Sequence, residues 1–122
     1  MKRFMRNPSP GLVAAFHTEL DKARNAFRAG YLRPSWRHLE RAHILGQPYA
    51  GLHTLAHWKM LCFAFRIKDT REILGQLPRL LVGGVKSFVG HVPVGNTGGA
   101  DVPPLQPMEI PADLAAIIKA HS

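Results

Sequence analysis

Apolar residues in the first part of the chain recur every three or four positions, which is the spacing of an amphipathic helix. This spacing predicts a first helix from Gly11 to Arg28. Its apolar positions are Phe16, Leu20, Ala23 and Phe27. Gly30 should end this helix, because glycine accepts without strain the left-handed conformation that follows a helix. A second helix is expected to have Pro34 in its first turn, where the missing N–H is harmless, and to end near Gly46.

The pattern continues into two further helices. A third is expected from about Ala50 to Arg66. A fourth should begin after Asp69, whose side chain can cap it, with Glu72 at the third helical position. Its apolar positions are Ile73, Leu74, Leu77, Leu80 and Leu81. Pro78 lies inside this pattern and predicts a kink or an early stop.

The composition changes after Gly83. Glycine and proline become frequent, which predicts an extended arm, and a short helix is expected from Pro111 to about Ala120. The chain is therefore expected to comprise a basic N-terminal segment (residues 1–10), a helical domain (11–84) and a Gly/Pro-rich arm with a short C-terminal helix (85–122).

The four main helices predict an all-α fold of two antiparallel helical hairpins. In the first pair, small and packing residues fall at the offsets of a tetratricopeptide unit, a helix–turn–helix of about 34 residues. These residues are Ala23, Gly30, Ser35, Leu39 and Ala42. Two hairpins are fewer than a stable solenoid normally needs, so both a tetratricopeptide-like and a four-helix arrangement are open.

The chain has 122 residues, a formal net charge of +8 and one cysteine, which excludes an intramolecular disulfide. The length indicates one domain. The charge would suit nucleic acid, but the arginines are spaced as on solvated helix faces, and the aromatic residues do not interleave with them as a base-stacking surface would. The arginine pairs at this spacing are Arg24 with Arg28 and Arg37 with Arg41. Nucleic-acid binding is therefore disfavoured. The sequence shows neither a signal peptide nor a bilayer-spanning segment, so the expected location is the cytoplasm.

Several longer motifs resemble one known family. They are HLERAHILGQPYA, HTLAHW, REILGQLPRL, PVGNTGG and PMEIPADL, and the resemblance runs from about Phe16 to Leu114. The family consists of small bacterial proteins catalogued as a domain of unknown function. The resemblance implies a small, largely helical protein and an association with heavy-metal resistance genes, but no activity. The chemistry must therefore come from the residues themselves.

Two pairs of polar residues in the second and third predicted helices have the spacing of metal ligands. His53 and His57 are four residues apart, so both imidazoles can reach one ion from the same helix face. Glu40 and His43 have the E-x-x-H spacing of di-metal carboxylate bundles. The connection between these helices is short, so they should be antiparallel neighbours. If the faces that carry these residues meet, the four side chains converge, and Glu19 of the first helix could complete the set.

Ligands of this kind suit a divalent transition metal: zinc, iron, nickel, cobalt or manganese, and copper if the sulfur of Met60 faces the ion. The leading hypothesis is a metal-binding protein of metal homeostasis or resistance. Two alternatives are open. In the first, a bound metal ion with an open coordination position could activate water or dioxygen, and the protein would be a metal-dependent enzyme. With structural histidines, the chain would be a tetratricopeptide-like module whose basic concave face binds an acidic protein partner. Exposed hairpin ends would also allow a homodimer.

Overall fold

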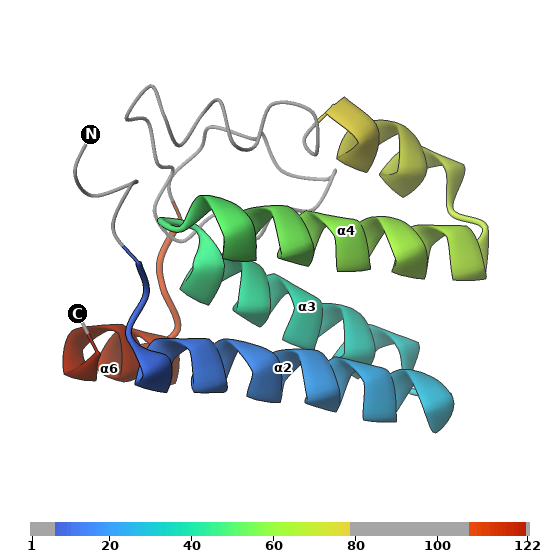
Figure 1. Ribbon diagram of the computed structural model, residues 1–122. Helices are drawn as coiled ribbons and strands as arrows, with labels where there is room; N and C mark the ends of the chain where they lie inside the picture. Colours follow the sequence, from blue (N-terminus) through green and yellow to red (C-terminus); the bar gives the residue numbers. More distant parts are fainter. Residues whose placement is uncertain (1–6, 79–107, 122) are drawn as a thin grey trace.

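Helices are the only regular secondary structure in the residues that the computed structural model describes, 7–78 and 108–121 (Figure 1). They are α2 (Pro10–Arg28), α3 (Leu32–Gly46), α4 (Ala50–Ile67) and α6 (Ala112–Ala120). Another helix, unlabelled in Figure 1, covers residues 70–78 at the edge of the described part. The all-α prediction is thus confirmed here. Most of the predicted Gly/Pro-rich arm lies outside the described residues, as does any kink after Pro78, whereas the short terminal helix is α6.

The helix boundaries follow local signals in the sequence. Gly30 has a φ of +86° directly after α2, as expected of a glycine that ends a helix. Lys68, at φ 58°, adopts the left-handed conformation and ends α4. Asp69 then accepts a hydrogen bond from the N–H of Glu72 at 3.1 Å, so it caps the helix at 70–78 as predicted.

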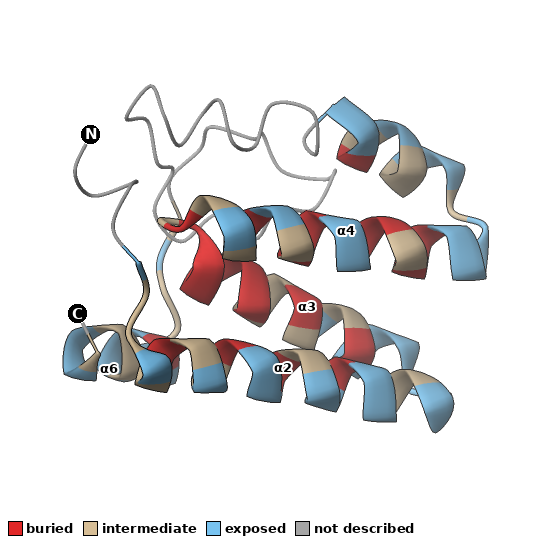
Figure 2. Cartoon of the chain, viewed as in Figure 1, coloured by how far each residue is buried: buried red, intermediate tan, exposed pale blue. Residues whose placement is uncertain are grey.

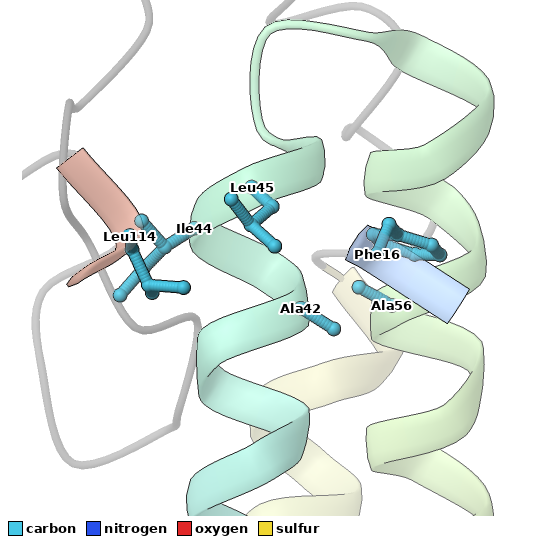
Figure 3. Close-up of a cluster of buried hydrophobic side chains, with 6 residues drawn as sticks. All are labelled: Phe16, Ala42, Ile44, Leu45, Ala56 and Leu114. Atoms are coloured by element: carbon cyan, nitrogen blue, oxygen red, sulfur yellow. The ribbon is translucent and has the colours of Figure 1, made fainter. Parts of the chain in front are cut away.

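α3 is the central helix of the fold. It packs between α2 and α4, and successive helices run in opposite directions (Figure 1). Their buried sides face one another, while the outer sides are exposed (Figure 2). One core cluster joins α2, α3, α4 and α6, and consists of Phe16, Ala42, Ile44, Leu45, Ala56 and Leu114 (Figure 3). A second cluster joins α2, α3 and α4, and consists of Ala23, Leu39, Met60 and Phe63.

Two side-chain orientations differ from expectation. In the helix at 70–78, Leu74 and Leu77 are 65% and 43% exposed, whereas Gln76 is completely buried. Arg41 was expected on a solvated face, yet its side chain is only 17% exposed because it forms ion pairs with two other helices. In both cases the inward-facing side chain is a polar one that forms a hydrogen bond or an ion pair. The spacing of hydrophobic residues alone does not predict such an orientation.

No helix among the described residues is long and apolar enough to cross a membrane.

Candidate metal centre

Three imidazole rings meet between α3 and α4. His43 projects from α3, and His53 and His57 project from α4. The Nε2 atoms of the three rings are each 3.1 Å from the other two, so they form an equilateral triangle. All three residues are at most 3% exposed. Among the described residues, this is the one group of three His, Cys, Asp or Glu residues whose candidate ligand atoms come within 4.8 Å of one another.

The close approach of α3 to α4 places these rings in contact. Gly46 ends α3, and a Cβ atom there would lie 2.8 Å from the Cβ of Leu52 in the first turns of α4. A larger residue would therefore push the two helices apart. On α4, the i,i+4 spacing puts His53 and His57 on one face, one turn apart. The antiparallel neighbour α3 then supplies His43 from the opposite side.

A fourth residue fixes the proton on one of the rings. The amide oxygen of Gln76 lies 2.6 Å from Nδ1 of His57, and an amide oxygen can only accept. Nδ1 of His57 therefore carries the proton, and in the neutral ring Nε2 presents its lone pair to the centre of the triangle. The amide nitrogen of Gln76 in turn donates to Glu72 at 3.1 Å, which fixes the orientation of the amide. A histidine held in this way by an outer hydrogen bond is typical of metal ligation.

Hydrogen bonds among the three rings cannot give every Nε2–Nε2 contact one donor and one acceptor. Each Nε2 atom either donates through a proton or accepts through a lone pair. Among three such atoms, at least two are in the same state, so at least one of the three 3.1 Å contacts joins two donors or two acceptors. A contact of that kind is unfavourable in a buried site. One cation facing three lone pairs removes the conflict.

The structure brings together three of the five predicted ligands, and the two carboxylates lie outside the triangle. Glu19 is buried on α2, where it binds His38 Nδ1 at 2.7 Å and Arg41 Nε at 2.9 Å. Both of these contacts are to Oε1, and Arg41 Nη2 donates to Oε2 at 3.2 Å, so both oxygens are engaged by side chains of α3. Glu40 lies in the middle of α3, where its Oε1 is 3.5 Å from Nη1 of Arg37. Neither carboxylate belongs to the group of converging ligand atoms.

Glu19 belongs instead to a charge network that joins three helices. Burial raises the pKa of its carboxyl group, but the hydrogen bonds and positive charge of Arg41 and His38 outweigh burial, so the pKa lies below its ordinary value. Arg41 also binds Asp113 of α6, and this hydrogen bond lowers the pKa of Asp113. Both carboxylates are therefore ionised at neutral pH, and the network attaches α6 to the central pair of helices.

Gln76 is a residue of the candidate site that the sequence did not predict. Its signal was weak: it follows Glu72 by four residues, so the two share a helix face. Nothing in the sequence around this uncharged side chain indicates that it forms a buried hydrogen bond with a histidine 19 positions earlier in the chain. Only the docking of the helix at 70–78 on α4 reveals it.

Comparison with known proteins places the chain in a family but not in a functional class. The family described as "Protein of unknown function (DUF3703)" matches residues 11–118, and the chain belongs to it. This confirms the resemblance that the sequence motifs indicated. No curated protein and no solved structure matches the chain.

Proposed function

We propose that this chain, as a member of that family, binds one transition metal ion through the Nε2 atoms of His43, His53 and His57. The observation that carries the proposal is the buried triangle of Nε2 atoms with sides of 3.1 Å. Three imidazoles from two helices, one of them oriented by an amide, are the donor set of many protein metal sites. The two carboxylates are left out of the ligand set.

The size of the triangle suits a first-row ion. The centre of an equilateral triangle with 3.1 Å sides is about 1.8 Å from each corner, slightly less than the zinc–nitrogen bond length of 2.0–2.1 Å. The three Nε2 atoms would hold such an ion, and a site with three protein ligands would leave a further coordination position for water or another small ligand.

An all-imidazole donor set narrows the choice of ion. Imidazole suits zinc, copper, iron and nickel, whereas manganese prefers oxygen ligands, which the converging group lacks. Met60 packs in the second core cluster with Ala23, Leu39 and Phe63, so its thioether supplies no argument for copper. We assign the protein to metal handling, namely sequestration, delivery or sensing in homeostasis or resistance.

The test is the metal content of untagged protein from metal-supplemented cells, measured by elemental mass spectrometry. The wild type should carry one ion per chain, and a His53→Ala, His57→Ala variant should carry none. A His17→Ala, His121→Ala variant is the matched control, because it also loses two imidazoles and leaves the triangle intact. Circular dichroism of both variants separates loss of ligands from loss of folding.

The affinity should also depend on pH. Protons compete with the ion for the three Nε2 lone pairs, so the affinity must fall as the pH drops from 7 towards 5. A folded wild-type protein that is empty, or whose affinity is flat across this range, would rule out imidazole ligation. Folding and partner binding that are indifferent to chelator would then favour an interaction module with structural histidines.

A further inference from the structure

A groove of about 370 Å³ is lined mainly by residues of α2 and α4, together with Ser35 and Leu39 of α3. None of the three clustered histidines lines it, so the groove is separate from the proposed metal site. On α2 its lining runs from His17 to Phe27, which corresponds to about 15 Å at the helical rise of 1.5 Å per residue. Its volume is at the lower end of the range typical of small-molecule sites, about 300–1,000 Å³.

The inner part of the groove is apolar. Its larger hydrophobic lining residues are Leu20, Phe27, Leu39, Leu55 and Phe63, and Ala23 and Cys62 also line it. Phe27 and Phe63 meet edge to face with ring centroids 5.5 Å apart, so α2 and α4 are in contact at one end. A ligand of the groove must therefore present an apolar body, since burial of such a surface is the main source of affinity.

The rim of the groove is positively charged. Arg24, Lys59 and Arg66 line it, and Asp21 is the one acidic lining residue. Asp21 is paired with Arg24 at 3.0 Å, so these two charges offset each other. Arg66 stacks over the ring of Phe27 at 5.3 Å. Within the described part of the chain, Lys59 and Arg66 form no ion pair, so two cations face the apolar groove.

We infer that this groove binds an amphipathic carboxylate, a small molecule with an unbranched or aromatic apolar body and one anionic end. The apolar lining disfavours a purely polar anion such as phosphate, and the cationic rim disfavours an amine. A length of about 15 Å would hold only four or five residues of an extended peptide, at 3.3 Å per residue. A small amphiphile, by contrast, can bury its whole apolar body there and place its carboxylate beside Lys59 and Arg66.

The experiment uses decanoate as the probe, below its micelle concentration, with the full chain in excess chelator. Binding is measured by calorimetry, and the site is mapped by amide chemical shifts. Decanol serves as the uncharged analogue. Lys59→Glu is compared with Lys22→Glu, which makes the same change in charge at an exposed residue of α2 that does not line the groove.

Decanoate should bind saturably and shift amides of α2 and α4 along the groove, and decanol should bind more weakly. Lys59→Glu should weaken decanoate binding about three- to tenfold, as expected for reversal of one exposed charge, and Lys22→Glu should leave it unchanged. Equal binding of decanol, equal effects of the two variants, or shifts outside the groove would overturn the inference. So would an acidic peptide that binds in the groove when decanoate does not.

Discussion

Replacement of Gln76 by leucine gives a direct test of the proposed metal centre and leaves all three proposed ligands in place. Leucine has a similar size but cannot accept the proton of His57 Nδ1, which lies 2.6 Å from the amide oxygen in the wild type. The ring of His57 would lose the partner that fixes its tautomer and orientation. Loss of an outer hydrogen bond of this kind lowers metal affinity about 10- to 100-fold, or about 1.4–2.7 kcal/mol.

The assay is competition between the protein and a chromophoric chelator for Co²⁺ and for Zn²⁺, at pH 7 and constant ionic strength. Leu74→Ala is the matched control, because Leu74 is on the same helix and is 65% exposed. The affinities should rank wild type and Leu74→Ala first, Gln76→Leu next and His57→Ala last. The absorption of bound Co²⁺ at saturation should have the same intensity in Gln76→Leu as in the wild type, since the three ligands remain.

Agreement of Gln76→Leu with the wild type within a factor of two would refute the reasoning, because His57 would then need no outer partner. A loss as large in Leu74→Ala as in Gln76→Leu would also refute it, since the effect would come from the helix as a whole.

Two further predictions concern stability. Gly46→Ala should destabilise the fold by about 1–3 kcal/mol in urea unfolding, because the new methyl group would lie 2.8 Å from the Cβ of Leu52. Gly51→Ala, where the added Cβ meets no atom within 4 Å beyond its chain neighbours and the backbone of its own helix, should be neutral or stabilising by up to about 1 kcal/mol; equal losses in both variants would contradict the packing argument. The lowered pKa of Glu19 means that its ion pair with Arg41 stabilises the fold above the ordinary value of 4.5 and is lost as the pH falls through the folded-state value. Glu19→Gln should therefore be less stable at pH 7 and lose less stability than the wild type between pH 5 and about pH 3; parallel pH profiles would show that the pair contributes nothing.

The parts of the fold that depend on local signals could be predicted from the sequence. The end of α2 follows from Gly30 alone, and the start of the helix at 70–78 follows from the side chain of Asp69. His53 and His57 share a face of α4 because of their spacing, whatever α4 packs against. The approach of His43 required in addition that α3 and α4 be close antiparallel neighbours with these faces turned towards each other.

The choice among competing polar partners could not be predicted. Glu19 was expected to reach the histidines, but Arg41 and His38 on the facing side of α3 offer it charge and two hydrogen-bonding groups. Arg41 also donates a hydrogen bond to Asp113, which is 72 residues further along the chain, and no spacing rule connects the two residues. Such pairings are set by the relative rotation of packed helices, which depends on the whole core.

The attachment of the helix at 70–78 has a consequence for motion. Gln76 is its only fully buried side chain, while two of its leucines face outward. A segment docked through so little apolar surface opens locally at a lower free energy than the core helices do. A ligand that requires the docked form opposes this opening by its own binding free energy. Binding of a metal ion to the three histidines would then slow amide hydrogen exchange in the helix at 70–78, although this helix supplies none of the ligands.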